Sequence, residues 1–210
     1  MKLIIFDYDG VLVDSFDLTV KCYIDLSREF KLNLPEHQEF YRDLLELDWR
    51  ETLRKLRFVT PRQIRDANRI FIEAVKKYGE DVRPYRDIPK VLDALSKKYI
   101  LAIATNNLKP ELDYRLKKFD LRKYFSAVFT SEDGDLKPSP DLLMKCMKRF
   151  DVRPAESAFI GDMDGDIISG KAAKVGKTVA VTYGYHLKHR LLEADIIIDS
   201  PAELLETFRK

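Results

Sequence analysis

The sequence has little cysteine and no long apolar run, and each shortage disfavours a class of protein. Its two cysteines, Cys22 and Cys146, lie inside apolar helical patterns, which favours reduced core thiols over a disulfide or a metal pair. No stretch approaches the ~20 apolar residues of a membrane span. The apolar start at Leu3–Phe6 is too short for a secretory signal and is broken by Asp7. We therefore expect a cytoplasmic protein with no membrane partner.

The sequence also lacks an excess of either positive or negative charge. Among 210 residues, 37 are Lys or Arg and 35 are Asp or Glu, so the formal net charge is only +2, and no block of like charge occurs. Such a balance gives no sign of a nucleic-acid or membrane surface. A chain of this length can form one α/β domain with a modest insertion and bury a sizeable core.

Six short apolar runs, separated by helical patterns, predict β-strands. Parallel strands need crossover connections, which helices supply. The alternation therefore predicts an α/β fold with a doubly wound parallel sheet, a Rossmann-like core. The expected inner strands are Leu3–Phe6, Ile100–Ala104, Ser157–Ile160 and Thr178–Val181, and the shorter outer ones are Ala127–Phe129 and Asp195–Ile198.

The segment from residue 15 to about residue 81 breaks this alternation, because it shows helical periodicity and no good strand. An insertion of this length is usually a lid or a binding module. We therefore expect a small α-helical cap domain of residues 15–81 and a core domain of residues 1–14 and 82–210.

Polar residues gather at the carboxyl ends of the expected strands, where open parallel sheets bind their ligands. Carboxylates brought together repel one another, and Mg²⁺, a hard cation with oxygen ligands, removes that repulsion. A carboxylate can attack phosphorus, while an ammonium and a hydroxyl stabilise the oxygens of the transferring group. The pattern predicts phosphoryl transfer by Asp7, Asp9, Thr105, Asn106, Lys137, Asp162 and Asp166.

Four short motifs contain these residues and occur in a fixed order: Asp7-Tyr8-Asp9-Gly10, Thr105-Asn106, Lys137-Pro138, and Gly161-Asp162 with Asp166. Any one of them alone is weak, since such short patterns arise by chance. Together they resemble the motifs of the haloacid dehalogenase-like superfamily, on its phosphatase side. The likeness runs over essentially the whole chain, and the helical insertion resembles the small cap that follows the first motif in that family.

The resemblance implies roles for the acidic residues. Asp7 would be the nucleophile and a metal ligand. Asp9 would be the general acid and base, with its backbone carbonyl on the metal. Asp162 would be the third protein ligand of the Mg²⁺ cofactor. Asp166 would complete the metal site by positioning metal-bound water or Lys137.

The resemblance also implies how the phosphoryl group is held. Thr105, Asn106 and Lys137 would bind the substrate. The implied sheet has the first strand at its centre, so that Thr105 and Asp162 flank Asp7.

Several functions remain open at this point. Asp9 disfavours dehalogenation, which has no alcohol leaving group to protonate. Sugar phosphomutases of this family carry a cap-hinge histidine, whereas Asp17–Lys21 contains none. A pyrophosphatase and a non-catalytic binding protein are further alternatives. We expect a phosphoglycolate phosphatase-like enzyme that is Mg²⁺-dependent. It would hydrolyse a small phosphorylated metabolite through an aspartyl-phosphate, with 2-phosphoglycolate as the best single substrate.

Residues near the motifs have plainer interpretations. Ser15 is expected as the N-cap of the first cap helix, and Asp164 is explained by the helix macrodipole. His186 is expected at the surface. Arg50 and Arg54 could reach an anionic substrate, although in so highly charged a chain a solvated face is the favoured interpretation. We expect a monomer or a homodimer.

Overall fold

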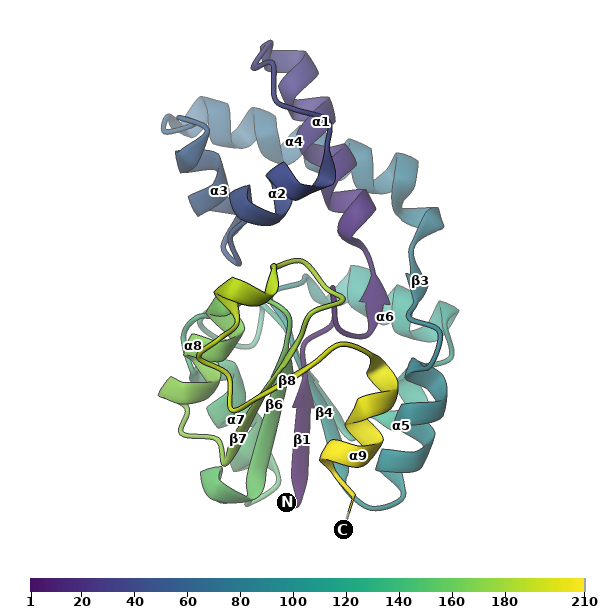
Figure 1. Cartoon of the computed structure of the whole chain (residues 1–210). Coiled ribbons are helices and arrows are strands. Elements are labelled where there is room, and N and C mark those ends of the chain that lie inside the picture. The colour runs from purple at the N-terminus through teal and green to yellow at the C-terminus, as the bar shows by residue number, and fades with distance from the viewer. Residues whose placement is uncertain (210) are drawn as a thin grey trace.

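The computed structural model describes residues 1–209, with a sheet-based core at one end and a helical cap at the other (Figure 1). The core sheet has six strands: β1 (Leu3–Phe6), β4 (Ile100–Ala104), β5 (Ala127–Phe129), β6 (Ser157–Gly161), β7 (Lys177–Val181) and β8 (Ile196–Ile198). Their order is β5-β4-β1-β6-β7-β8, and every neighbouring pair is parallel. The predicted doubly wound α/β sheet is confirmed, with strand ends shifted by at most one residue.

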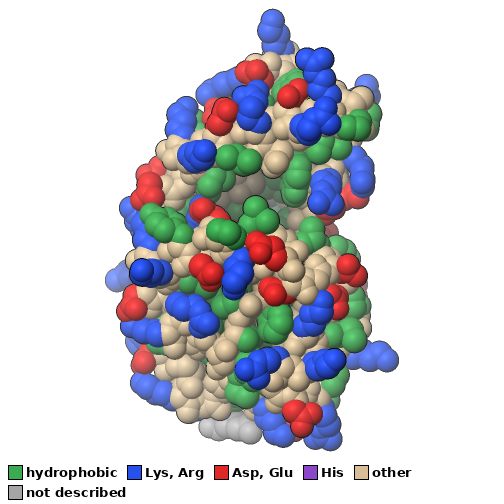
Figure 2. All heavy atoms as spheres, turned by 180° about the vertical axis from the view of Figure 1, so that it is seen from behind, with side chains coloured by type: hydrophobic (Ala, Val, Ile, Leu, Met, Phe, Trp, Pro, Cys, Tyr) green, Lys and Arg blue, Asp and Glu red, His purple; other side chains and the backbone are tan. Residues whose placement is uncertain are grey.

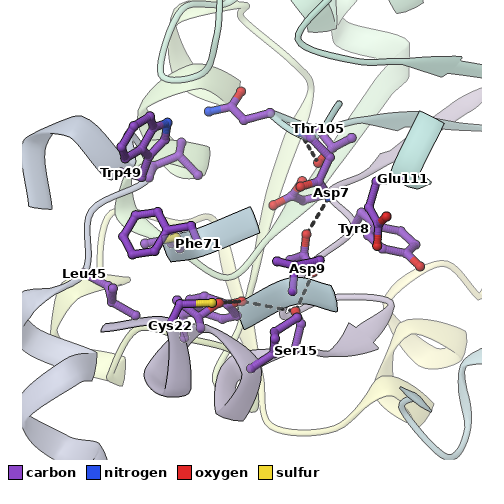
Figure 3. Close-up of a pocket in the computed structure, with 18 of the residues that line it drawn as sticks. Asp7, Tyr8, Asp9, Ser15, Cys22, Leu45, Trp49, Phe71, Thr105 and Glu111 are labelled. Atoms are coloured by element: carbon purple, nitrogen blue, oxygen red, sulfur yellow. Dashed lines mark hydrogen bonds between the residues drawn. The ribbon is translucent and has the colours of Figure 1, made fainter. Parts of the chain in front are cut away.

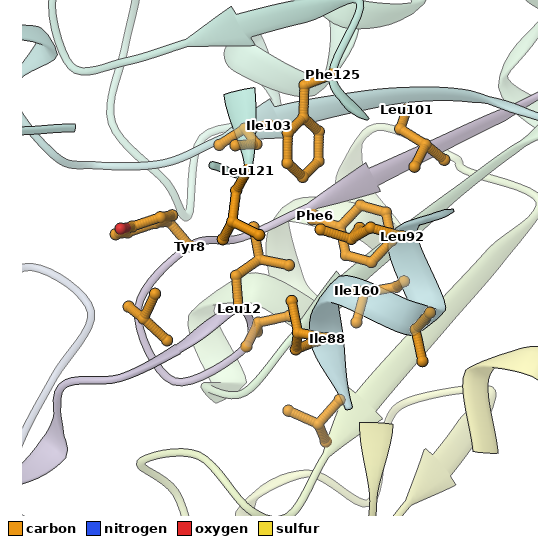
Figure 4. Packing of buried hydrophobic residues seen from close by; sticks show 14 of the residues in the cluster. Phe6, Tyr8, Leu12, Ile88, Leu92, Leu101, Ile103, Leu121, Phe125 and Ile160 are labelled. Atoms are coloured by element: carbon orange, nitrogen blue, oxygen red, sulfur yellow. The ribbon is translucent and has the colours of Figure 1, made fainter. Parts of the chain in front are cut away.

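Helices cover both faces of this sheet: α5 (Ile88–Ser96), α6 (Lys109–Lys118) and α9 (Leu204–Thr207) on one, α7 (Asp141–Arg149) and α8 (Asp164–Ala172) on the other. Successive side chains of β1 point to opposite faces. Ile4 and Phe6 join the cluster of α5 and α6, where Figure 4 shows Phe6 beside Leu92, and Leu3 and Ile5 join that of α7. Because both faces are buried, the strands read as continuous apolar runs.

Four helices form the cap: α1 (Phe16–Phe30), α2 (Gln38–Leu44), α3 (Trp49–Lys55) and α4 (Pro61–Tyr78). A reciprocal capping box between Thr60 and Gln63 starts α4. The apolar sides of α1 and α4 face each other, with the ring centroids of Tyr23 and Phe71 at 5.0 Å. Within residues 1–209, no helix combines the length and the hydropathy that a bilayer crossing requires.

The chain passes between core and cap twice, and the two passages pair with each other. β2 (Val13–Asp14) and β3 (Arg83–Pro84) form a small antiparallel sheet. Strands of two residues are too short for any periodicity, so the sequence did not predict them. The cap also rests on the core, because Met163 and Tyr185 of the core belong to the apolar cluster of the cap. The carboxyl ends of β1, β4 and β6 therefore face the cap (Figure 1).

Candidate active site

The loop after β1 begins with Asp7 and turns sharply at Gly10. Asp7 follows the strand directly and is only 5% exposed. Gly10 adopts φ +72°, and a Cβ there would lie 2.0 Å from Oδ2 of Asp162. Two features therefore require glycine at position 10: the left-handed backbone and the close approach of the Asp162 side chain. Because β4 and β6 flank β1, Thr105 and Asp162 lie on either side of Asp7, as expected.

Three buried carboxylates meet at this edge. Asp7, Asp162 and Asp166 each offer an oxygen within 4.8 Å of the others. Burial raises the pKa of Asp7 to about 7, although Lys137 opposes the shift. Burial also raises the pKa of Asp162 well above its usual range, and the charges of Asp166 and Asp7 add to the effect. The cluster resists carrying full negative charge without a further cation.

The same cluster passes a test for a magnesium site. Oδ1 of Asp162 is buried and accepts no hydrogen bond within the described part of the chain. A buried carboxylate oxygen left without a donor costs free energy, which a bound cation recovers. The donors are all oxygens, the ligands that Mg²⁺ prefers. The residues present therefore fit a hard divalent cation.

Lys137 lies fully buried between two of these carboxylates. Its Nζ is 2.8 Å from Oδ1 of Asp7 and 2.7 Å from Oδ1 of Asp166. Burial works against its charge, but the two carboxylates outweigh burial and raise the pKa of Lys137, so that it stays an ammonium. The other oxygen of Asp166 accepts the amides of Asp162 and Met163 at 3.2 and 3.1 Å. Both Asp166 oxygens are thus engaged in holding Lys137 and the turn after β6.

Asp9 is held by two donors from different parts of the chain. Its Oδ1 accepts the Ser15 hydroxyl at 2.5 Å, and its Oδ2 accepts the Asn107 side-chain amide at 2.5 Å. Ser15 is the N-cap residue of α1, as expected, but its hydroxyl makes no capping hydrogen bond. It bonds instead to Asp9 and to the Tyr185 hydroxyl, 3.1 Å away. The reason is proximity, since the paired strands β2 and β3 bring the start of α1 over the first-motif loop.

The two residues after β4 differ in what they contact. Thr105 is 3% exposed, and its hydroxyl accepts a hydrogen bond from the backbone amide of Asn107 at 3.3 Å. Asn106 forms a two-way clamp on the backbone of Lys137, donating to its carbonyl at 3.0 Å and accepting its amide at 2.9 Å. Asn106 therefore positions the Lys137 loop, in addition to lining the pocket.

Tyr185 and His186 lie at the site in ways that the sequence did not predict. The backbone amide of Tyr185 donates to Oδ2 of Asp162 at 2.7 Å. His186 is fully buried, so the expected surface position is wrong. Its Nδ1 accepts the amide of Asp164, which leaves the proton on Nε2 to donate to the Leu45 carbonyl at 3.0 Å. Burial lowers the pKa of His186, in keeping with this neutral form.

A polar latch ties the cap to the core beside the site. We use this name for Glu46, Asp164 and Arg190. The guanidinium of Arg190 contacts Asp164 and both oxygens of Glu46, the latter at 3.1 and 3.2 Å. Asp164 thus faces Arg190 and stands outside the three-carboxylate cluster of the described chain. The latch holds the connection between α2 and α3 against the core.

A cavity of about 310 Å³ lies between the cap and these strand ends. Figure 3 shows Asp7, Asp9 and Thr105 on one side of it and Leu45, Trp49 and Phe71 on the other. The exposed Arg50 and Arg54 do not line it, and Arg54 pairs with Glu51. The solvated-face interpretation of these two arginines therefore describes them better than substrate contact.

Comparison with known proteins agrees with this geometry. The sequence model of the family described as haloacid dehalogenase-like hydrolase matches residues 4–181. The chain belongs to the haloacid dehalogenase-like hydrolases. A family member of Streptococcus pneumoniae with a solved structure superposes with a TM-score of 0.86, over 100% of this chain and 99% of that one, at 21% identity. The predictions of an enzyme and of its superfamily are confirmed.

Curated relatives of this haloacid dehalogenase-like hydrolase carry several substrate names. A phosphorylated carbohydrates phosphatase of Thermotoga maritima is 26% identical, covering 100% of this chain and 99% of the relative. A phosphoglycolate phosphatase of Aquifex aeolicus is 30% identical, covering 98% and 96%. A pyrophosphatase of Bacillus mycoides is 26% identical, covering 98% and 95%. All three relatives are named as phosphatases or pyrophosphatases, and their names differ in the substrate.

Proposed function

We propose that this protein is a magnesium-dependent phosphatase that hydrolyses small phosphomonoesters through an aspartyl-phosphate on Asp7. The observation that carries the proposal is the site around Asp7. Lys137 lies 2.8 Å from its carboxylate, and Asp162 offers an oxygen with no hydrogen-bond donor. Asp9, held by two donors, stands in the same cavity. Burying an ammonium and three carboxylates at one point costs free energy, and phosphoryl transfer explains this arrangement better than simple binding does.

The reaction follows from these residues in two steps. An oxygen of Asp7 attacks phosphorus, the bond from phosphorus to the ester oxygen breaks, and Asp9 gives that oxygen its proton. Water then attacks the phosphorus of the aspartyl-phosphate, Asp9 takes the proton of that water, and Asp7 is released. Lys137 stabilises the phosphoryl oxygens in both steps. Magnesium, held by Asp7, Asp162 and the Asp9 backbone, would supply charge neutralisation for the phosphoryl group.

Hydrolysis is favoured over sugar phosphomutase chemistry. A mutase needs a base for the sugar hydroxyl, and the described residues that line the cavity include no histidine. Near Asp9 the cap contributes Ser15 and Thr19, whose hydroxyls both bond to Tyr185. Neither hydroxyl is a base at neutral pH, so water is the better acceptor.

2-Phosphoglycolate and pyrophosphate are candidate substrates because relatives bear those names. The carboxylate of 2-phosphoglycolate was expected to meet Arg50 or Arg54, and neither lines the cavity. The preference for this ester therefore rests on the relatives alone.

Trapping the covalent intermediate tests the proposal. We expect a phosphoenzyme on Asp7 when a phosphomonoester is quenched with acid during turnover in magnesium, mapped by peptide mass spectrometry. Asp7→Asn should form no phosphoenzyme and release no phosphate, while Asp93→Asn, an exposed change on α5, should behave as the parent. A phosphoenzyme on any other residue, or turnover by Asp7→Asn, would refute the proposal.

A further inference from the structure

The cavity wall opposite the site is apolar and is built by three parts of the cap. Helix α1 contributes Cys22 and Tyr23, the segment at the start of α3 contributes Trp49, and α4 contributes Phe71 and Val75. The aromatic rings pack together, with Phe71 centroids 5.0 Å from Tyr23 and 5.7 Å from Trp49. Figure 2 shows the hollow between cap and core with hydrophobic side chains around it. We call Cys22, Tyr23, Trp49, Phe71 and Val75 the cap wall.

Charge in the cavity is unfavourable for a second anionic group. Arg115 is the one cation among the described residues that line it, and its Nε bonds to Glu111 at 2.7 Å. Glu111, Glu46 and Asp9 line the same space, so negative groups outnumber this guanidinium. A carboxylate on the leaving group would meet more repulsion than attraction once the phosphoryl group occupies Lys137.

Most polar side chains near the wall are already engaged with protein; among the described residues that line the cavity, the buried hydroxyls of Tyr8 and Tyr23 have no hydrogen-bond partner. Ser15 and Asn107 donate to Asp9, and Thr19 bonds to Tyr185 at 2.8 Å. Glu46 is held by Arg190. A sugar in this space would bury more hydroxyl groups than these two phenols can partner, and a buried hydroxyl without a partner costs free energy. An apolar ring has no such groups and gains free energy from the same wall.

We propose that the physiological substrate class is phosphomonoesters of uncharged alcohols that carry an apolar ring, with the ring seated on the cap wall. This inference rests on the proposed phosphatase function, and it selects among that function's substrates. A cavity of about 310 Å³ equals the liquid volume of about ten water molecules, more than a two-carbon acid fills beside its phosphate. The two parts of the substrate are thus recognised by opposite sides: phosphate by the core, ring by the cap.

Three esters of primary alcohols separate the possibilities, because their leaving groups are chemically alike. They are 2-phenylethyl phosphate, 2-phosphoglycolate and glucose 6-phosphate, assayed with magnesium on one enzyme preparation. We expect kcat/KM for 2-phenylethyl phosphate to exceed both others by at least about tenfold, the discrimination typical of a hydrophobic pocket. An equal or higher kcat/KM for either of the other two esters would overturn the inference.

Variants of the cap wall locate the effect. Trp49→Ala should lower kcat/KM for 2-phenylethyl phosphate by about tenfold more than it lowers kcat/KM for 2-phosphoglycolate. Val75→Thr replaces a methyl group of the wall by a hydroxyl group of similar size. It should raise KM for the phenyl ester while the protein stays folded. Arg54→Ala, on the exposed cap surface, is the matched control. Equal losses for all esters in both wall variants would mean that the wall is only structural.

The outcomes distinguish this inference from the proposed function. If Asp7-dependent hydrolysis occurs and 2-phosphoglycolate is the best ester, the phosphatase stands and the ring preference falls. In that case Arg115→Met should abolish the preference for the acid, because Arg115 is the cation available to it. If none of the esters is hydrolysed with magnesium, the proposed function fails and the inference fails with it.

Discussion

Asp9 differs from the other carboxylates of the site in its surroundings. Asp7, Asp162 and Asp166 form a buried cluster around Lys137, whereas Asp9 is half-buried and takes one hydrogen bond on each oxygen. Those two bonds fix the direction of its carboxylate. A group that must give and then take a proton works best when it is held in place and open to substrate.

Asp9→Asn should remove the proton transfer to and from the substrate. General acid–base assistance is typically worth ~10²–10⁴-fold, so kcat should fall by at least about a hundredfold. The new side chain has only one acceptor oxygen, so it can no longer accept from both Ser15 and the Asn107 side-chain amide. Steady-state kinetics on one alkyl ester measures the loss, with the thermal unfolding midpoint as a check on folding. A loss below tenfold would show that another group moves the proton.

Loss of Lys137 should reduce kcat far more than loss of Arg50. Lys137→Ala removes the ammonium between Asp7 and Asp166, and loss of one positioned donor of this kind costs about 10²–10³-fold in kcat. Arg50→Ala removes an exposed charge that does not line the cavity and should leave kcat and KM unchanged. Both are measured with a small generic ester. Similar losses in the two variants would place the phosphate-binding charge elsewhere.

At the scale of elements, the connection between α2 and α3 decides how the cap meets the core. Arg190 contacts Glu46 from the cap and Asp164 from the start of α8. His186 adds a bond to the Leu45 carbonyl, and Trp49 follows directly at the start of α3. Movement of this connection therefore moves one side of the substrate cavity.

Breaking the latch should loosen that side of the cavity. Arg190→Ala leaves Glu46 and Asp164 without their shared cation, and we expect KM to rise about tenfold, equal to about 1.4 kcal/mol, with a smaller change in kcat. Hydrogen exchange should become faster in residues 44–49. Lys188→Ala, an exposed change two residues away, is the control. Unchanged exchange in residues 44–49 would show that the latch does not hold this connection.

At the scale of the whole molecule, a bound metal ion would link the core's stability to its chemistry. Asp7 and Asp162 come from the ends of neighbouring strands, β1 and β6, and repel each other in the absence of a cation. An ion that binds only the folded chain stabilises it by mass action, by about 2.7 kcal/mol at a hundred times its Kd.

We therefore predict that magnesium raises the thermal unfolding midpoint and that excess chelator abolishes phosphatase activity. Asp162→Asn should weaken the response of the midpoint to magnesium, because it removes the carboxylate oxygen that lacks a donor. Differential scanning calorimetry with and without magnesium measures the shift, and the exposed Asp93→Asn on α5 serves as control. Full activity in chelator would contradict the metal assignment.

Much of the molecule could be predicted from the sequence because the signals are local. Strands such as Leu3–Phe6 are continuous apolar runs, and each is followed by its own polar turn, so the sheet and the order of the four motifs can be read directly. Parallel strands end at one edge, and this places Asp7, Lys137 and Asp162 together. The roles given to these residues stay predictions.

Only the tertiary structure decided which distant residues complete the site. Ser15 reaches Tyr185 across 170 positions, and Asp9 reaches Asn107 across 98. The burial of His186 and the place of Trp49 on the cavity wall likewise depend on how the cap packs on the core. The amino-acid sequence by itself determined the sheet, the helical cap and the order of the motifs, because local hydrophobic periodicity encodes them. The cap wall arises where α1, α3 and α4 meet, and no local pattern records that meeting.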